Sequence, residues 1–190
     1  MDKSKIELPD VAEDLKLYTL KNSNFQSKRD YISLSNAFLP ADVLFDNYCN
    51  GYIASDVERL KCYKGYQMEK DLLRRLQSIY GDNLRVDVEI TSCSKMVQGH
   101  PDFALYDFPG DCKSVLKDEW LPVNNRLPNK VYYQLQAYML YSSINKAVII
   151  YESRESGLLW SAWIPKNEAV QKIIYDKIND VLLKIKNIGV

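Results

Sequence analysis

The sequence predicts an α/β (α+β) fold, with a mixed central β-sheet flanked by helices, and three observations support this class. An amphipathic helical pattern over residues 64–80 precedes three short strand patterns between 85 and 116. A second helical pattern over 130–144 is followed by the wholly apolar run 147–151, which is typical of a central strand covered on both faces. One more strand and a long amphipathic helix come next. Three strands in a meander, then a crossover helix and a buried strand, imply a mixed sheet with helices packed on it.

The length and composition are those of one globular domain. The chain has 190 residues, of which 46% are apolar and 26% charged, which argues against disorder and against a fibrous fold. Its 25 basic and 25 acidic residues leave no net charge, so any site for a polyanion must be local. No apolar run approaches the roughly 18 residues of a spanning helix, and the start lacks the apolar stretch of a signal peptide. We therefore expect a cytoplasmic protein with no membrane partner.

The first part of the chain has the weakest pattern. Residues 1–30 are polar and weakly periodic, and we expect residues 1–60 to form an irregular or helical N-terminal extension of a single domain, 1–190. The helix over 64–80 is better defined, because its apolar residues recur at helical spacing and Gly81 follows as a stop signal. These apolar residues are Leu72, Leu73, Leu76 and Ile79.

Three strands are predicted next. Residues 85–90 and 97–106 alternate polar and apolar side chains, and 111–116 form the third strand. The tripeptide Phe108-Pro109-Gly110 is predicted to make the turn before this third strand. The turn-rich segment 117–130 is predicted to be a loop.

The remaining elements complete the predicted order. After the helix over 130–144 and the strand over 147–151, residues 158–164 are predicted to form one more strand. Apolar residues at helical spacing over 170–185 then define a long amphipathic helix. The chain thus divides into the N-terminal extension, a core over 64–152, and a C-terminal strand and helix over 153–190.

The four cysteines do not resemble a zinc site. Cys49, Cys62, Cys93 and Cys112 contain no C-x-x-C pair, and His100 is the only histidine available to complete a site. We expect four reduced, mostly buried thiols.

Three charged residues of the predicted strands can form a cation site. Asp111 and Lys113 are two apart on a strand, so both side chains project from the same face. A short turn can bring Asp102, on the preceding strand, beside Asp111. Two carboxylates this close repel each other unless a cation lies between them. Mg²⁺ is the natural cation, because it takes one or two carboxylates and completes its shell with waters and substrate phosphate oxygens.

Lys113 would direct its ammonium into the same site. There it can orient a water or stabilise the charge that grows on a phosphorus under attack. The Asp-x-Lys triplet is weak evidence by itself, since residues 14–16 repeat it in what we interpret as a solvated charged segment.

The two flanking helices supply further polar residues. Glu69 shares the apolar stripe of its helix, where it either meets a positive partner or is partly solvated and favoured by the helix dipole. Gln134 and Tyr138 lie four residues apart, which places an amide and a phenol on one helix face. Such a pair also occurs in ordinary packing.

Taken together, these residues resemble the PD-(D/E)XK nuclease superfamily. The resemblance rests on Glu69, the run Gly99-His100-Pro101-Asp102, the run Asp111-Cys112-Lys113, and the pair Gln134 and Tyr138. The Gln-x-x-x-Tyr element is similar to that of the RecB-type and phage lambda exonuclease branch. The resemblance covers residues 64 to about 152 and implies a restriction-endonuclease-like core with the helix, three-strand, helix, strand order given above.

The resemblance also implies roles for these residues. Asp102 and Asp111 would bind Mg²⁺ or Mn²⁺ together with Glu69 and the backbone carbonyl of Cys112, and Lys113 would complete the catalytic set. Gln134 and Tyr138 would line the site beside the DNA. The aspartate at 111 is a departure, because the RecB-type branch more often has glutamate there. The late cysteines that hold an iron–sulfur cluster in some relatives are missing, so we expect no such cluster.

Other aromatic and basic residues could contact substrate. His100 could be a metal ligand, a general base or a substrate contact, or it could be a strand-start histidine bonded to backbone. Tyr132 and Tyr133 are candidates for base stacking, although packing is the commoner role of tyrosines. The segments 61–75 and 113–130 are locally basic, which suits a phosphate track.

The function expected from these patterns is that of a Mg²⁺-dependent nuclease acting on DNA. The resemblance of the Gln134 and Tyr138 pair to the RecB-type and phage lambda exonuclease branch implies an exonuclease acting from DNA ends in recombination, repair or phage DNA processing. Two alternatives stay open: a catalytically silent nucleic-acid-binding module of the same fold, and a dimeric endonuclease. DNA is the expected partner, with a homo-oligomer or a recombination protein as further possibilities.

Overall fold

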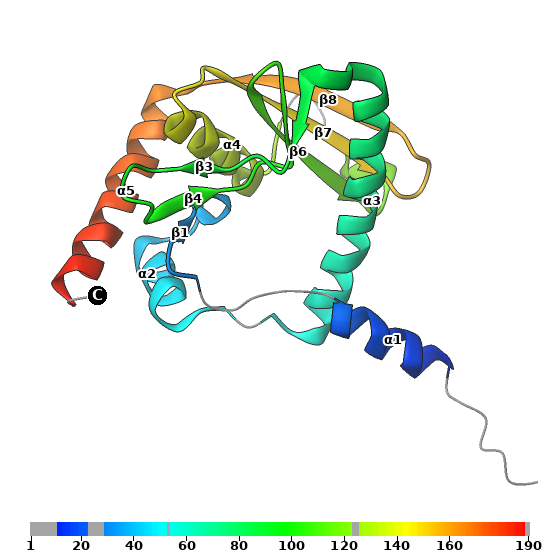
Figure 1. The fold of residues 1–190 in the computed structure, drawn as a ribbon, viewed down its shortest axis with the longest axis horizontal. Helices are drawn as coiled ribbons and strands as arrows, with labels where there is room; N and C mark the ends of the chain where they lie inside the picture. The colour runs from blue at the N-terminus through cyan, green and yellow to red at the C-terminus, as the bar shows by residue number, and fades with distance from the viewer. Residues whose placement is uncertain (1–10, 23–28, 53, 123–125, 189–190) are drawn as a thin grey trace, which may run out of the picture.

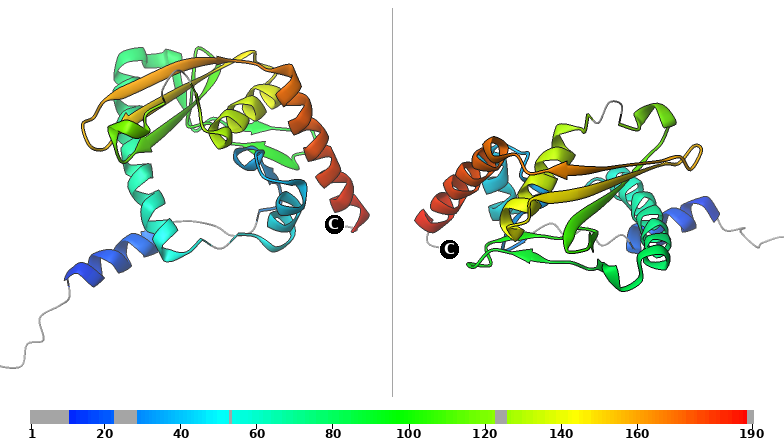
Figure 2. Two further views of the ribbon diagram at one scale, coloured as in Figure 1. Left: turned by 180° about the vertical axis from the view of Figure 1, so that it is seen from behind. Right: turned by 90° about the horizontal axis from the view of Figure 1, so that it is seen from above.

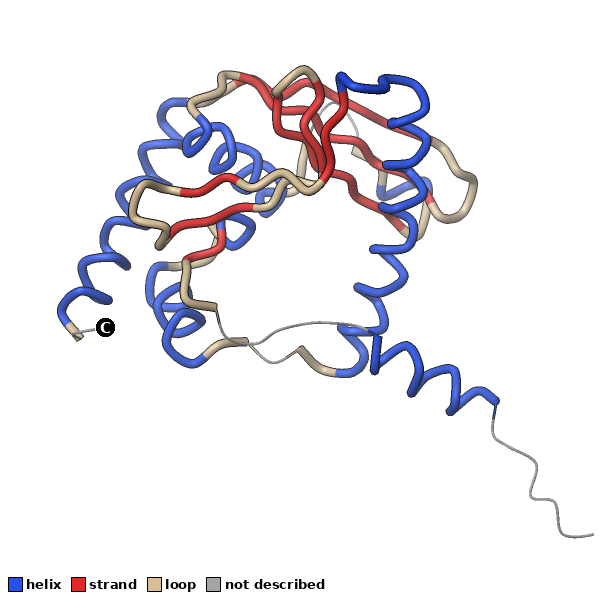
Figure 3. Tube along the Cα trace, in the orientation of Figure 1, coloured by secondary structure: helices blue, strands red, loops and turns tan. Residues whose placement is uncertain are grey.

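The structure is a computed structural model that describes residues 11–22, 29–52, 54–122 and 126–188. Two β-sheets lie at its centre and helices surround them (Figures 1 and 3). The helices α3 (Asp56–Tyr80) and α5 (Glu168–Asn187) stand on opposite sides of the sheets, as the turned views also show (Figure 2). The predicted mixed α/β class is confirmed.

The larger sheet has the strand order β2-β5-β6-β7-β8. Its strands are β2 (Leu84–Val86), β5 (Phe103–Leu105), β6 (Phe108–Val115), β7 (Lys146–Ser153) and β8 (Leu159–Pro165). Only β6 and β7 pair in parallel, and α4 (Asn129–Ser142) lies between them in the chain as the crossover helix. The predicted order of helix, three strands, helix and strand is therefore confirmed, with β8 and α5 as the additional strand and helix.

A second, smaller sheet was not predicted. It consists of β1 (Ile32–Ser33), β4 (Val97–Gly99) and β3 (Ile90–Thr91). The prediction of one strand over 85–90 is wrong, because Asp87 adopts a positive φ of 56° and redirects the chain from the larger sheet to the smaller one. The prediction of one strand over 97–106 is also wrong, because the chain leaves β4 at His100 and re-enters the larger sheet at Phe103.

The turn between β5 and β6 differs from the predicted one. Tyr106 and Asp107 both have positive φ, 49° and 68°, as a tight two-residue hairpin connection requires. Pro109 and Gly110 lie inside β6, where Gly110 pairs with Phe103. The turn predicted at 108–110 is therefore wrong, since the turn is made by the two residues before it.

Capping residues define the first turns of α3 and α5. α3 starts eight residues earlier than predicted, because the Ser55 hydroxyl accepts from the Glu58 N–H and the Glu58 carboxylate accepts from the Ser55 N–H. It ends at Gly81, which has a φ of 52° and continues into the short 3₁₀ helix η3 (Gly81–Asn83). Asn167 caps α5 by accepting from the Val170 N–H. A further 3₁₀ helix, η4 (Asp118–Trp120), lies in the predicted loop after β6, whose residues 123–125 are outside the described part.

Part of the predicted N-terminal extension is built into the core. This region contains α1 (Val11–Asn22), β1, the 3₁₀ helix η2 (Leu34–Asn36) and α2 (Ala41–Asn50), while residues 1–10, 23–28 and 53 lie outside the described part. Leu34 and Leu44 are buried in the same apolar cluster as α4 and α5. The second Asp-x-Lys triplet lies on α1, where Lys16 pairs with Glu13 on an exposed face.

The two faces of the larger sheet have separate apolar cores. One core, with Leu135, Ile149 and Ile178, lies under α4 and α5, and the other, with Leu72 and Phe103, lies under α3. Ile79 does not join the α3 stripe, because it is 71% exposed.

The cysteines and the length of the helices can also be compared with the sequence. None of the four cysteines forms a disulfide, but only Cys112 is buried while Cys62 and Cys93 are exposed, so the expectation of mostly buried thiols is wrong. Among the described residues, no helix has both the length and the apolar character needed to cross a membrane.

Candidate active site

The hairpin of β5 and β6 brings two carboxylates together. Asp102 directly precedes β5, and its Oδ2 accepts a hydrogen bond of 2.6 Å from the backbone N–H of Cys112 on β6. Asp111 therefore lies one residue from the atom that Asp102 contacts. The turn at Tyr106 and Asp107, not the one predicted at 108–110, thus brings the two acids close together.

Asp111 is the most deeply buried charged residue of this group. Only 1% of its side chain is exposed, against 28% for the side chain of Lys113, with which its Oδ2 forms an ion pair. Its Oδ1 accepts a hydrogen bond of 2.9 Å from Gln134 on α4. Among the described residues, Oδ2 has only the Lys113 ammonium as a partner and accepts no hydrogen bond of standard geometry.

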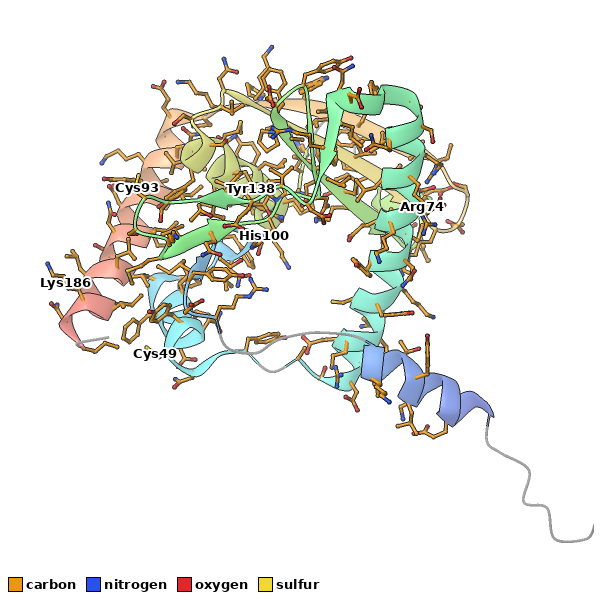
Figure 4. All side chains as sticks on the ribbon, in the orientation of Figure 1. Cys49, Arg74, Cys93, His100, Tyr138 and Lys186 are labelled. Carbon is orange, nitrogen blue, oxygen red and sulfur yellow. The ribbon has the colours of Figure 1, made fainter. Side chains whose placement is uncertain are left out.

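Gln134 and Tyr138 lie beneath Asp111. The Gln134 Nε2 donates to Asp111 and also to the Tyr138 hydroxyl at 2.9 Å, and that hydroxyl donates to the carbonyl of His100 at 3.2 Å. Both side chains are buried, with exposures of 6% and 1%. Figure 4 shows Tyr138 and His100 close together at the centre of the molecule. In this arrangement the pair holds Asp111 in place, and its predicted contact with DNA stays a prediction.

Glu69 and His100 line a cavity beside the two aspartates. The cavity has a volume of about 270 Å³ and lies between α3 and the segments that lead into β3 and β5. Besides Glu69, His100 and Asp102, its walls include Tyr66, whose ring lies 4.4 Å from the Lys70 ammonium. The cavity opens beside the carboxylates and offers room for a substrate group.

Burial and mutual repulsion raise the pKa of the acids. Burial, and then the charge of Asp111, raise the pKa of Asp102 well above its usual range. Burial also raises the pKa of Glu69, with Lys113 opposing this shift. Burial alone would lower the pKa of Lys113, but the carboxylates of Asp111 and Asp102 outweigh it and raise that pKa. The site therefore contains three carboxyl groups and one ammonium that stays charged.

The donor set fits Mg²⁺ or Mn²⁺ only with ligands from solvent and substrate. Within the described part of the chain, no three His, Cys, Asp or Glu side chains are grouped closely enough to hold an ion by themselves. Mg²⁺ needs only one or two carboxylates from the protein. Asp102 and Asp111 would supply these, and Asp111 Oδ2 has only the Lys113 ammonium as a partner among the described residues. A ligand role for Glu69 and for the Cys112 carbonyl stays a prediction.

Two side chains at the site were not singled out from the sequence. Tyr151 on β7 is the register partner of Lys113, and its buried hydroxyl has no hydrogen-bond partner among the described residues. Arg154, just after β7, bonds to Ser114, the neighbour of Lys113. Neither residue carries a sequence signal, because their proximity to the site arises from the pairing of β6 with β7.

Tyr132 and Tyr133 have a different environment from the one expected for base stacking. Both are half-buried against the core under α4 and α5. The Lys177 ammonium also lies 5.5 Å from the centre of the Tyr133 ring. This environment favours the packing role over base stacking.

Comparisons with known proteins show a shared fold at low identity. No family model matches the sequence, and no curated protein matches it. Among solved structures, the chain is similar to the alkaline exonuclease LHK-Exo of Laribacter hongkongensis in complex with dAMP (TM-score 0.62, 11% identity, 92% of this chain and 93% of that one). It is also similar to a phage-related exonuclease of Haemophilus somnus 129PT (TM-score 0.58, 11% identity, 80% and 91%). A protein designated SSO0001 matches with a TM-score of 0.58 and 16% identity over 90% and 86%. The fold is that of these exonucleases, as expected for a chain that resembles the PD-(D/E)XK superfamily.

Proposed function

We propose that this protein is a divalent-metal-dependent nuclease that hydrolyses DNA phosphodiester bonds. The observation that carries the proposal is the buried Asp111 carboxylate, held between Gln134 and Lys113, beside a second carboxylate on Asp102. Such a pair of acids is destabilising unless a cation joins it. The exonuclease fold of the neighbours supports the same conclusion.

Each residue of the site has a distinct part in the proposal. Asp102 and Asp111 would hold Mg²⁺ or Mn²⁺, with Glu69 as a further ligand or as a ligand of a metal-bound water. The bound metal would activate a water for in-line attack and stabilise the leaving oxygen. Lys113, whose raised pKa keeps it charged, stabilises the charge that develops on the phosphoryl oxygens. Gln134 and Tyr138 position Asp111.

The favoured mode of action is exonucleolytic cleavage from DNA ends. The resemblance of the Gln134 and Tyr138 pair and the names of two structural neighbours support this mode. The absence of net charge agrees with it, because a protein that engages an end contacts few phosphates. An endonuclease and a silent DNA-binding module are the alternatives.

A cleavage assay tests the proposal. Linear duplex labelled at one end, covalently closed plasmid and circular single strands are incubated with Mg²⁺, with Mn²⁺ or with EDTA. We expect metal-dependent release of mononucleotides or short oligonucleotides from the linear DNA alone, and none with Asp111→Asn or Lys113→Ala. Lys16→Ala is the matched control, since Lys16 is the lysine of the other Asp-x-Lys triplet and is exposed on α1.

The other outcomes separate the alternatives. Equal rates on closed circles would replace the exonuclease by an endonuclease. Metal-independent cleavage, or cleavage that survives Asp111→Asn, would overturn the proposed site. DNA binding without cleavage under every metal condition would favour the silent binding module.

A further inference from the structure

Arg154 is held in a fixed orientation beside the candidate site. Its guanidinium donates to the Ser114 hydroxyl through Nε at 3.2 Å and through a terminal nitrogen at 2.6 Å. Its backbone N–H donates to the Val115 carbonyl at 2.8 Å. Since Ser114 directly follows Lys113 on β6, the guanidinium is anchored to the strand that carries the catalytic lysine.

The turn that carries Arg154 is itself braced. The hydroxyls of Ser153 and Ser156 donate to the Asp118 carboxylate at 2.5 and 2.6 Å, and the Asp118 N–H donates to Glu155 at 3.1 Å. Arg154 therefore sits on a β7–β8 turn that is fastened on both sides to the segment after β6. Such fixation lowers the entropy that the side chain loses when it binds a ligand.

The guanidinium faces α3 close to Glu69. A terminal nitrogen of Arg154 lies 3.5 Å from the position that a Cβ on Gly65 would occupy, and Gly65 is one helical turn before Glu69. The positive charge of Arg154 also acts on the site, where it opposes the rise in the pKa of Glu69.

Arg154 differs from its neighbour Arg75 in its partners. Arg75 forms ion pairs with Asp71 at 3.2 Å and with Glu152 at 2.5 Å. Among the described residues, Arg154 has no carboxylate within ion-pair distance and only a neutral hydroxyl as acceptor. A half-buried guanidinium that has a fixed orientation and only a hydroxyl as acceptor is suited to bind an anion of another molecule.

We infer that Arg154 binds a phosphate of the DNA strand next to the one that is cleaved, an inference that rests on the proposed nuclease function. A guanidinium presents parallel N–H groups that match two phosphate oxygens. Lys113 and Arg154 then mark the two ends of a short phosphate track across the carboxyl ends of β6 and β7.

The experiment measures DNA binding by the whole chain in EDTA, so that no cleavage occurs. Fluorescence anisotropy with a labelled duplex gives Kd at several salt concentrations for the wild type, Arg154→Gln, Arg154→Lys and the control Arg85→Gln, an exposed arginine outside both basic segments that pairs with Asp107 at 2.7 Å. Arg154→Gln should weaken binding about tenfold or more, as expected for the loss of a charge-assisted hydrogen bond. The slope of log K against log salt should become less steep by about 0.9, the value of one phosphate contact on duplex DNA. Arg85→Gln should change neither quantity, because its charge is already paired with Asp107.

The outcomes are distinguishable from those of the proposed function. If the wild type cleaves DNA but Arg154→Gln keeps both Kd and slope, the inference fails and the nuclease stands. If the wild type neither binds nor cleaves DNA, both fail. If Arg154→Gln has a lower Tm than the wild type, the test rests on Arg154→Lys. Weaker DNA binding by Arg154→Lys with an unchanged salt slope supports bidentate phosphate binding, and an unchanged Kd overturns it.

Discussion

Replacing Gly110 by alanine should disturb the candidate site through a single steric overlap. A Cβ at this position would lie 2.2 Å from the nearest ring atom of Phe103, its register partner on β5. Ordinary carbon contacts are near 3.5 Å, so the overlap is about 1.3 Å. The ring is fully buried and cannot move toward solvent.

The expected cost follows from this overlap. Overpacking of a core by this amount costs about 1–3 kcal/mol, which corresponds to a fall in Tm of roughly 2–12 °C for a chain of this length. Activity should fall further than stability, because displacement of Phe103 moves its neighbour Asp102 relative to Asp111. A misplacement of about 1 Å can reduce a rate by about 100-fold.

The assay compares Gly110→Ala with Gly65→Ala, the same substitution at a position where a Cβ fits without overlap. At Gly65 the new Cβ meets only an ordinary contact at 3.5 Å, and alanine favours the helix by about 1 kcal/mol. Gly65→Ala should therefore raise Tm by about 2–4 °C and keep the cleavage rate. Melting by differential scanning fluorimetry and the rate on end-labelled duplex are measured for both. A Gly110→Ala protein with wild-type Tm and rate would refute the reasoning.

Three further changes follow from the charges and the buried hydroxyl of the site. Asp102→Asn should raise Tm in EDTA while abolishing cleavage, because it removes a buried charge that burial and Asp111 disfavour. Lys113→Ala should lower Tm in EDTA by an amount equivalent to about 2 kcal/mol, less than for a fully buried pair because 28% of the lysine side chain is exposed. Tyr151→Phe should stabilise the fold by about 1 kcal/mol in chemical denaturation, since it removes a buried hydroxyl without a partner among the described residues. In metal-free protein, the stability that protonated Asp102 and Glu69 contribute is present below about pH 4 and is lost as the pH rises through their raised pKa values. The Tm should therefore fall as the pH rises through this range. Asp102→Asn should make this fall in Tm smaller.

The long elements could be predicted because each buries one continuous face. The expected helix over 130–144, strand over 147–151 and helix over 170–185 correspond to α4, β7 and α5 with shifts of at most two residues at each end. Apolar periodicity alone defines such faces. The start of α3 depends on a different signal, the Ser55 and Glu58 capping box, which lies before the apolar periodic part of the helix.

The short strands could not be predicted for a physical reason. Strands β3 and β4 contain two and three residues, too few for an alternating pattern to distinguish one sheet from another. The change of sheet depends on the positive φ of Asp87, a local conformation that an aspartate tolerates but does not require.

The candidate site was predictable where residues are close in the chain. Asp111 and Lys113 share a face by strand geometry, and the hairpin brings Asp102 to them. The proximity of Tyr151 and Arg154 depends instead on the register between β6 and β7, which are separated by the whole of α4. No pattern within either strand specifies that register.

The hydrogen bonds beneath Asp111 also explain why an amide and a phenol stand at these positions. The His100 carbonyl can only accept, so the Tyr138 hydroxyl must donate to it and accept from its other neighbour. That neighbour is Gln134, which must therefore turn its NH₂ group toward Tyr138, and the same NH₂ group faces Asp111. A backbone carbonyl thus fixes the direction of every bond in the series. Asp111 receives only donors, from Gln134 and Lys113, which is the environment that an ionised carboxylate needs if it is to bind a cation.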